Sequence, residues 1–214
     1  YFVDDENSKT LFLGYAVAAM RLHRQLEEME IPVDKDHPLF LYIPCGVGGA
    51  PGGVCFGAKE LWGDDVYCFF VEPTQAPCMA LGMATGLHSA ISVQDIGLTG
   101  LTAADGLAVG RPSGFVGKTV EHLVSGEFTV EDDMLYRYMD ALLDSEGIFI
   151  EPSACAAFQG PCQLLRRPAS SAFLDAHGLR DKLENAAHIA WATGGSLVPD
   201  GVREEYRAKA RSLS

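Results

Sequence analysis

The chain has 214 residues, of which 48% are hydrophobic and 21% charged, and its formal net charge is -13. This composition can bury a real core in one domain, and the acidic excess argues against a nucleic-acid surface, which needs clustered Lys and Arg. No apolar run reaches the ~20 residues of a membrane span. The six cysteines include no C-x-x-C pair and lie mostly among apolar or small residues. We therefore expect buried free thiols and a cytoplasmic location rather than a disulfide framework.

The first third of the chain predicts alternating strands and helices. Residues 1–3 predict the end of a strand, and Ser8 is a suitable N-cap for a helix over residues 9–29, where apolar residues recur with a 3.6 period. Residues 39–43 predict a buried strand, and residues 66–71 predict a central parallel strand because they are apolar on both faces. A strand, a helix and a strand form a right-handed βαβ unit. We therefore expect an α/β fold with three Rossmann-like layers and a mostly parallel sheet.

A glycine-rich turn follows the first of these two buried strands. Its glycines allow positive φ and bring backbone N–H groups together, and the following residues, 54–61, predict a helix whose N-terminus faces the same point. The turn lacks the Gly-Lys-Ser/Thr of a Walker A motif, and the G-x-G-x-x-G fingerprint fails at Pro51. A tight turn without a ligand is the alternative, but the turn holds more glycine than a turn requires. These glycines are Gly46, Gly48, Gly49, Gly52 and Gly53.

The remaining elements continue the α/β pattern. A short helix is expected over residues 78–87, a structured loop region over 89–117, and a helix from Thr129, with Asp132 as its capping-box partner, to Gly147 at the C′ position. The last elements are a strand and turn over residues 148–153, a small-residue helix over 154–165, a final strand within 185–195 that opens into a glycine turn, and a polar helix over 201–214.

Four segments together resemble the D-serine dehydratase (D-serine ammonia-lyase) family. They are PCGVGGAPGG at residues 44–53, CFFVEPT at 68–74, AADGLAVGR at 103–111 and WATGG at 191–195. This family is one of the fold-type II enzymes of pyridoxal phosphate. The resemblance implies that residues 1–214 are the C-terminal part of the large, cofactor-binding domain, and that the small domain lies outside this chain.

The resemblance also implies a cofactor site. Thr193 would place its hydroxyl on the pyridine nitrogen of pyridoxal 5'-phosphate; the alternative is a threonine at a strand end that bonds its own backbone. Ser153, after the Glu-Pro of the expected turn, could face the ligand or act as a helix N-cap. The glycine turn would hold the cofactor phosphate through Gly46, Val47, Gly48, Gly49, Ala50 and Gly52.

Glu72 ends the second buried strand and resembles a glutamate that holds a cation near the cofactor in relatives. By this resemblance, the other ligands would be the backbone carbonyls of Ala76 and Cys78. Ligation by oxygen atoms alone suits a hard cation, such as potassium, sodium or magnesium, and a monovalent cation (potassium or sodium) is the expected one. The alternative is a glutamate that pairs with a helix terminus or an arginine.

The lysine that such an enzyme needs for its Schiff base is not recognisable here. In the family it lies upstream in a Ser-x-Lys setting, and none of the six lysines of this chain has that setting. The resemblance implies that the complete enzyme, with the N-terminal remainder, converts D-serine to pyruvate and ammonia by β-elimination, while this chain alone is inactive. The alternatives are a related ammonia-lyase for another small amino acid, or a non-catalytic phosphate-binding module.

Overall fold

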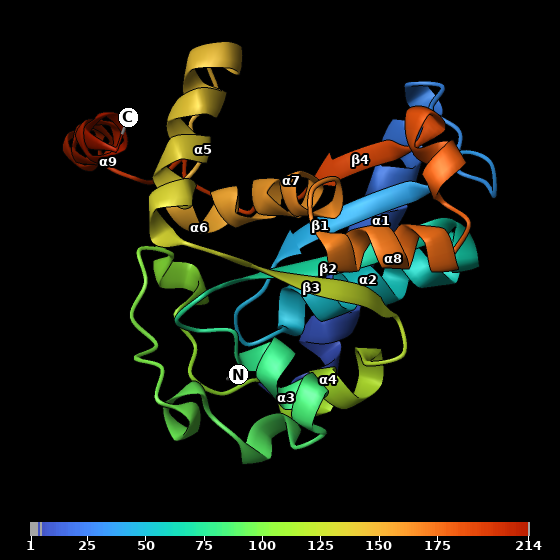
Figure 1. The fold of residues 1–214 in the computed structure, drawn as a ribbon, viewed down its shortest axis with the longest axis horizontal. Helices are drawn as coiled ribbons and strands as arrows, with labels where there is room; N and C mark the ends of the chain where they lie inside the picture. The colour runs from blue at the N-terminus through green and yellow to red at the C-terminus, as the bar shows by residue number, and fades with distance from the viewer. Residues whose placement is uncertain (1–3, 5, 214) are drawn as a thin grey trace.

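The computed structural model describes residue 4 and residues 6–213, so the strand expected over residues 1–3 lies outside the described part of the chain. Within it, four strands form one sheet in the order β3-β2-β1-β4, and every neighbouring pair is parallel (Figure 1). The predicted parallel α/β fold is confirmed. The strands are β1 (Leu39–Pro44), β2 (Val66–Pro73), β3 (Val124–Val130) and β4 (Ala187–Ala190).

Helices cover both faces of this sheet, which gives the three expected layers (Figure 1). On one face, α1 (Lys9–Glu28) and α2 (Gly49–Trp62) bury apolar residues of β1 and β2. On the other face, α7 (Gln159–Leu164) and α8 (Pro168–Ala176) cover the alternate residues of the same strands, including Phe40. The remaining helices are α3 (Cys78–Thr85), α4 (Gly114–Val120), α5 (Asp132–Glu146), α6 (Pro152–Cys155) and α9 (Asp200–Ser212).

Local sequence explains where the first elements begin. Ser8 caps α1 as predicted, because its hydroxyl oxygen accepts a hydrogen bond from the Leu11 N–H at 3.2 Å. All six residues of β1 are buried, as expected for a strand between two neighbours and under helices on both faces. The described residues include no helix long and apolar enough to cross a membrane.

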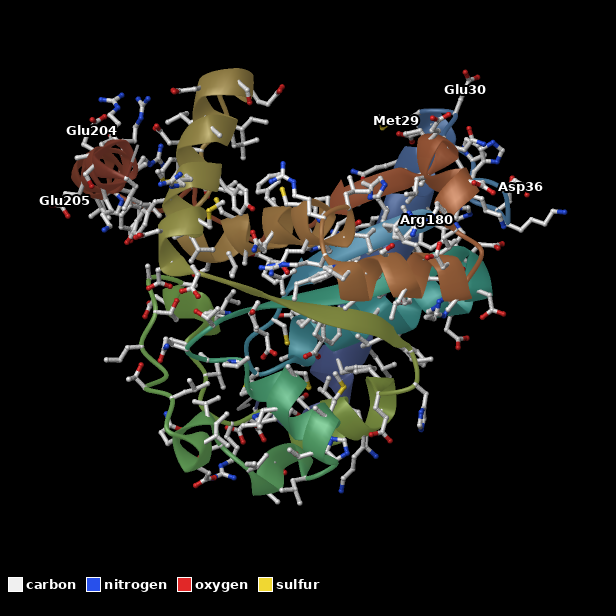
Figure 2. The ribbon with its side chains drawn as sticks, viewed as in Figure 1. Met29, Glu30, Asp36, Arg180, Glu204 and Glu205 are labelled. Carbon is white, nitrogen blue, oxygen red and sulfur yellow. The ribbon has the colours of Figure 1, made fainter. Side chains whose placement is uncertain are left out.

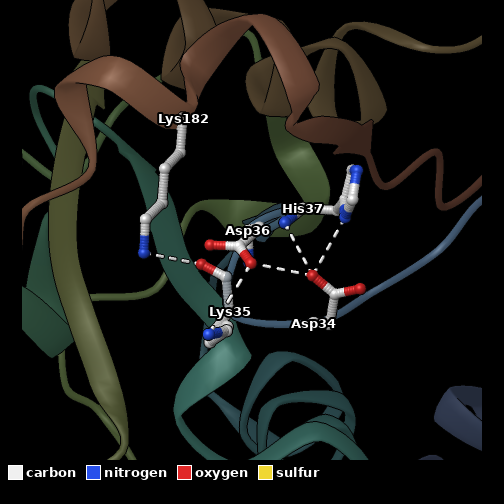
Figure 3. A network of polar contacts seen from close by, with 5 residues as sticks. All are labelled: Asp34, Lys35, Asp36, His37 and Lys182. Carbon is white, nitrogen blue, oxygen red and sulfur yellow. Dashed lines mark hydrogen bonds and ion pairs between the residues drawn. The ribbon is translucent and has the colours of Figure 1, made fainter.

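Polar contacts join the segment before β1 to the segment before β4 (Figure 3). Asp34 closes a tight turn before β1 by accepting hydrogen bonds from the backbone N–H groups of Asp36 and His37. The ammonium of Lys182, which precedes β4, donates to the Lys35 carbonyl at 2.6 Å. In Figure 2, Asp36 and Arg180 mark this end of the molecule. The Lys182 contact joins the segments that precede the two strands whose opposite ends carry the site.

The polar helix predicted near the end of the chain is confirmed as α9, which packs against α5. The Arg207 guanidinium forms ion pairs with Asp140 at 3.0 Å and Asp144 at 2.9 Å on α5. Glu204 and Glu205 point away from α5 on the outer side of α9 (Figure 2). The helix is therefore held through one face and remains polar on the other.

Three local predictions were wrong. Residues 124–130 form β3, a strand that was not predicted. Thr129 lies in this strand, so the predicted capping box between Thr129 and Asp132 does not form. The N-cap of α5 is Glu131. Residues 148–150 form no strand. The second helix, α2, begins at Gly49 and not near residue 54, because Pro51 fits the first turn of a helix, where no backbone N–H is needed.

Candidate cofactor-binding site

A cavity of ≈ 250 Å³ opens at the carboxyl end of β1. The loop after β1 enters α2 on one face of the sheet, whereas the chain reaches β4 by way of helices on the other face. The crossovers that leave β1 and reach β4 therefore lie on opposite faces of the sheet, and such a switch point between neighbouring parallel strands is where open α/β sheets bind ligands. The residues that line the cavity are Leu11, Tyr15, Pro44, Gly46, Val47, Gly48, Gly49, Ala50, Pro51, Gly106, Leu107, Glu151, Ser153 and Thr193.

The glycine turn presents free backbone donors to this cavity. Since α2 begins at Gly49, the N–H groups of Gly49 and Ala50 in its first turn have no acceptor within the helix. The positive end of the helix dipole lies at the same place. The Val47 carbonyl accepts a hydrogen bond from the Ser113 N–H at 2.9 Å, which fixes the turn against the segment before α4. The arrangement can bind an anion without a lysine.

Gly48 is the residue that allows this turn. Its φ of 111° lies in the left-handed region, and a Cβ there would lie 2.2 Å from the Cε of Met79. Any side chain at this position would therefore meet both backbone strain and a clash. The positive φ of Gly48 is therefore the main reason that this turn requires glycine.

Gly52 has a different position from the other predicted cradle residues. Its N–H donates to the Gly48 carbonyl at 2.9 Å, within the helical ladder of α2. A Cβ on Gly52 would lie 2.4 Å from Val116 of α4. Gly52 does not line the cavity, so in this structure it serves the packing of α2 rather than offering a free donor.

Thr193 reaches the same cavity from the loop that follows β4. Gly195 makes this loop possible: its φ is 138°, and a Cβ there would lie 2.4 Å from the backbone nitrogen of Glu151. The Glu151 N–H in turn donates to the Gly194 carbonyl at 3.1 Å. Gly48 of the glycine turn and Thr193 are 145 positions apart in the sequence, and the fold brings both to the lining of one cavity.

Ser153 and Gly106 complete the wall between these two loops. The Ser153 hydroxyl oxygen accepts a hydrogen bond from the Gly106 N–H at 3.1 Å, and Ser153 lies inside α6 rather than at its N-cap, which is Glu151. The Glu-Pro-Ser segment and the Ala-Asp-Gly segment were both identified in the sequence as candidate parts of the site. Only the fold shows that they pack together, because 47 residues separate the two partners.

Glu72 lies at the carboxyl end of β2 and is fully buried. Its carboxylate accepts hydrogen bonds from the backbone N–H groups of Met79 and Ala80, both at 2.8 Å, in the first turn of α3. This is the pairing with a helix terminus that was the alternative to cation binding. Each carboxylate oxygen keeps a second lone pair. Ala76 and Cys78, the other residues of the predicted cation site, are also buried.

A second glutamate, Glu127 on β3, lies beside Glu72. Glu127 is opposite Phe70, two residues before Glu72, so both side chains lie on the same face of the sheet. Both Glu127 carboxylate oxygens are buried and have no hydrogen-bond donor among the described residues. Burial raises the pKa of both carboxyl groups above the ordinary value. Glu127 was not predicted as a site residue, because no pattern around it in the sequence indicates a buried position.

All six cysteines are free thiols, and five of them are buried. The thiols of Cys45 and Cys78 both donate to the Gly46 carbonyl, at 3.6 Å and 3.4 Å. Burial raises the pKa of Cys45 and of Cys78 far above the usual thiol range. These two thiols therefore stay protonated and are poor nucleophiles. Their hydrogen bonds to the Gly46 carbonyl stabilise the glycine turn.

The fold is that of an open parallel α/β protein with a cavity at the switch point of its sheet. A family profile described as "Pyridoxal-phosphate dependent enzyme" matches residues 1–172. The chain belongs to this pyridoxal-phosphate dependent enzyme family. The cradle fits the phosphate of such a cofactor, because the helix-terminal N–H groups of Gly49 and Ala50 have no acceptor within α2 and both residues line the cavity.

Among curated relatives, the chain is 58% identical over 206 residues to a probable D-serine dehydratase of Geobacillus stearothermophilus, covering 96% of this chain and 45% of that protein. It is also 58% identical over 214 residues to a probable D-serine dehydratase of Bacillus cereus (strain B4264), covering 100% of this chain and 48% of that protein. The chain thus spans about half the length of the curated relatives it matches.

Solved structures share the fold at low sequence identity. A fungal L-serine ammonia-lyase from Rhizomucor miehei matches with a TM-score of 0.68 at 22% identity, over 97% of this chain and 59% of that one. The holo diaminopropionate ammonia lyase of Escherichia coli matches with a TM-score of 0.68 at 20% identity, over 93% of this chain and 46% of that one. These likenesses support the fold, which is that of the fold-type II enzymes of pyridoxal phosphate.

Proposed function

We propose that the chain is the C-terminal part of the large domain of a D-serine dehydratase, an ammonia-lyase that converts D-serine to pyruvate and ammonia. The observation that carries this proposal is the meeting of the glycine turn and Thr193 in one cavity at the switch point of the sheet. The 58% identity to probable D-serine dehydratases supports the choice of substrate. D-amino acid metabolism in the cytoplasm is the corresponding role, and the buried free thiols support that compartment.

In this role, the residues of the chain bind and orient the cofactor. Pyridoxal phosphate, when bound, supplies the electron sink that makes removal of the Cα proton feasible. The N–H groups of Gly49 and Ala50, with those of Gly46, Val47 and Gly48, would hold the phosphate. The Thr193 hydroxyl would hydrogen-bond the pyridine nitrogen as a neutral partner, which leaves this nitrogen largely unprotonated.

The same proposal includes a cation beside the cofactor, held by Glu72 with the carbonyls of Ala76 and Cys78. Its support is the location of Glu72 at the carboxyl end of β2, with a spare lone pair on each oxygen after the two hydrogen bonds from α3. Orphaned oxygens on the neighbouring Glu127 also fit a bound cation. The resemblance to the family favours potassium or sodium.

The complete enzyme would need the N-terminal remainder for catalysis. We place the Schiff-base lysine and the small domain in that remainder, because none of the six lysines here has the Ser-x-Lys setting. Residues 1–214 alone are therefore expected to form no pyruvate from D-serine. The partners of the chain in this proposal are that remainder and a small amino acid.

The experiment that tests the function is an assay of the complete enzyme with D-serine, L-serine, D-threonine and diaminopropionate. Pyruvate formation from D-serine, dependent on added pyridoxal phosphate and fastest among these substrates, is the expected result. Turnover of L-serine or diaminopropionate without D-serine turnover would assign the protein to a different ammonia-lyase. A protein that binds the cofactor and turns over none of them would support a non-catalytic module.

A further inference from the structure

A second cavity, of ≈ 390 Å³, opens between α5 and the end of α7. It lies beside the carboxyl end of β3, because the side-chain amide of Gln163 in its wall donates to the Thr129 carbonyl at 3.0 Å. Among the described residues, none lines both this cavity and the cofactor cavity. Its volume falls in the range of about 300–1,000 Å³ that is usual for small-molecule sites, and the proposed function does not use it.

Two consecutive arginines, Arg166 and Arg167, line this cavity, and none of the described residues in its wall is acidic. Neither guanidinium forms an ion pair with another described residue. The chain carries 29 acidic and 16 basic residues, and arginines elsewhere in it, such as Arg180 and Arg207, pair with aspartates. Two like charges in one hollow without a counter-charge repel each other, and an anionic ligand would relieve this repulsion.

The backbone holds the two arginines in place. The N–H groups of Arg166 and Arg167 both donate to the Gln163 carbonyl, at 3.2 Å and 3.0 Å, in the short connection between α7 and α8. Arg167 is also the N-cap of α8. Because both side chains leave a fixed backbone, less freedom is lost when they bind a ligand. A planar guanidinium matches the oxygens of a phosphate group with paired hydrogen bonds.

The rest of the wall adds one free acceptor and an apolar side. The Gln163 amide nitrogen is bonded to Thr129, whereas its amide oxygen has no donor among the described residues. Such an oxygen can accept a hydrogen bond from a hydroxyl group of a ligand. Met134 and Tyr138 of α5 contribute apolar and aromatic surface, and the Tyr138 hydroxyl is already bonded to Gln159.

We propose that this cavity binds a small phosphate ester that carries free hydroxyl groups, a sugar phosphate or a nucleotide, with its phosphate on Arg166 and Arg167. A phosphate monoester has a charge of about -1.5 to -2 near neutral pH, which the two guanidiniums balance. The Gln163 amide oxygen accepts from a hydroxyl of the ester. This site is separate from the cofactor cavity, so the inference goes beyond the proposed function and does not depend on it.

The test measures binding to the complete enzyme loaded with pyridoxal phosphate, so that the cofactor cavity is occupied. Titration calorimetry with inorganic phosphate, glucose 6-phosphate and AMP would compare the wild-type protein with the double variant Arg166→Gln/Arg167→Gln. We expect the affinity for the esters to fall about 10- to 100-fold in this variant, because hydrogen bonds between charged groups are lost. If the protein binds no pyridoxal phosphate, the comparison still decides, because the variant leaves the glycine turn unchanged.

The matched control is the double variant Arg21→Gln/Arg24→Gln. Arg21 and Arg24 are exposed on α1 and also have no ion-pair partner among the described residues, so this variant removes the same charge away from the cavity. Its affinity for the esters should equal that of the wild-type protein. An equal loss in both double variants would show a general charge effect and overturn the inference.

A further variant, Gln163→Met, tests the hydroxyl contact. It removes the amide oxygen and keeps a side chain of similar length. We expect weaker binding of glucose 6-phosphate and AMP, and unchanged binding of inorganic phosphate, which carries no sugar hydroxyl. An equal loss for all three would contradict the hydroxyl contact. The ester that the wild-type protein binds more tightly distinguishes a sugar-phosphate site from a nucleotide site.

A structural measurement needs no variant. Crystals of the loaded enzyme soaked in sodium tungstate, an anion with the shape and charge of phosphate, should show anomalous density in contact with Arg166 and Arg167. Density only elsewhere, no binding of either ester, unchanged affinity in the Arg166→Gln/Arg167→Gln variant, or guanidiniums that pair with acidic side chains of the N-terminal remainder would each overturn the inference. These readouts are heat and scattering, so a failed D-serine assay would leave them interpretable.

Discussion

Gly48 and Met79 pack so closely that a Cβ on Gly48 would lie 2.2 Å from the Met79 Cε. The Met79 side chain thus packs against Gly48, and the residues at the start of α2 that follow Gly48 line the cavity. The positive φ of Gly48 gives the turn its shape, and the side chain that packs against it comes from a residue 31 positions away.

Replacement of Gly48 should weaken cofactor binding in the complete enzyme. Gly48→Val would force a β-branched residue into a φ of 111°, at a cost of about 1–3 kcal/mol for the backbone strain alone. We expect a loss of pyridoxal phosphate affinity, measured by fluorescence titration. Gly14→Ala on α1 is the control, because a Cβ there meets nothing within 4 Å. Wild-type affinity in a folded Gly48→Val protein would contradict the role of the turn.

Thr193→Ala should lower cofactor affinity and turnover by removing one hydrogen bond to the pyridine nitrogen, a loss of about 0.5–1.5 kcal/mol. Thr193→Ser keeps the hydroxyl and should retain most of the affinity. The dissociation constant and kcat of the two variants would be compared with those of the wild-type enzyme. If the Ala and Ser variants behave alike, the hydroxyl has no such contact.

Gly195→Ala should destabilise the loop that carries Thr193. The new Cβ would lie 2.4 Å from the Glu151 nitrogen at a φ of 138°, which predicts a cost of about 1–3 kcal/mol. At the adjacent Gly194, a Cβ would lie 3.4 Å from the Glu151 carboxylate, so Gly194→Ala is the matched control. Thermal unfolding of the complete enzyme should separate the two variants. Equal melting temperatures of the two variants would show that the loop accommodates a side chain at position 195, which would contradict the prediction.

A pH effect is expected at β4. The His188 ring stacks on Phe40 with centroids 4.8 Å apart, and its Nδ1 lies 2.8 Å from the Tyr42 hydroxyl. Burial lowers the pKa of His188, so the folded state favours the neutral ring. Its contribution to stability is present above the ordinary histidine pKa of about 6.5 and is lost as pH falls through the lowered pKa of the folded state.

The variant His188→Asn should therefore reduce the difference between melting temperatures measured at about pH 7.5 and 5.5, a window that brackets the ordinary histidine pKa. His122→Asn is the control, because the His122 side chain is 87% exposed. An unchanged pH dependence in His188→Asn would show that another group dominates this range. The residue as a whole is exposed on an edge strand, so we expect a modest effect.

The sequence predicted the part of the site that depends on adjacent residues. Strand β1, the glycine turn and the start of a helix follow one another without interruption, and apolar runs identify β1 and β2. Thr193 was predicted only through family resemblance, since a threonine at a strand end has many uses. The structure brings it to the cavity with the turn.

The parts that could not be predicted depend on pairing between distant segments. Strand β3 contains Gly126 and Glu127, whose carboxylate oxygens are buried. Both residue types are unfavourable in strands, and the segment becomes a strand because β2 offers a partner edge. Residues 148–150 have the apolar pattern of a strand but pair with none. In both segments, the availability of a neighbouring strand for pairing decides the structure, and the intrinsic strand propensity of the residues does not.

The most direct test of the account is a crystal structure of the complete enzyme with pyridoxal phosphate. The account predicts the phosphate within hydrogen-bond reach of the backbone N–H groups of Gly48, Gly49 and Ala50, and the Thr193 hydroxyl on the pyridine nitrogen. A phosphate bound away from the start of α2, or a cofactor ring whose nitrogen meets a carboxylate in place of Thr193, would contradict it.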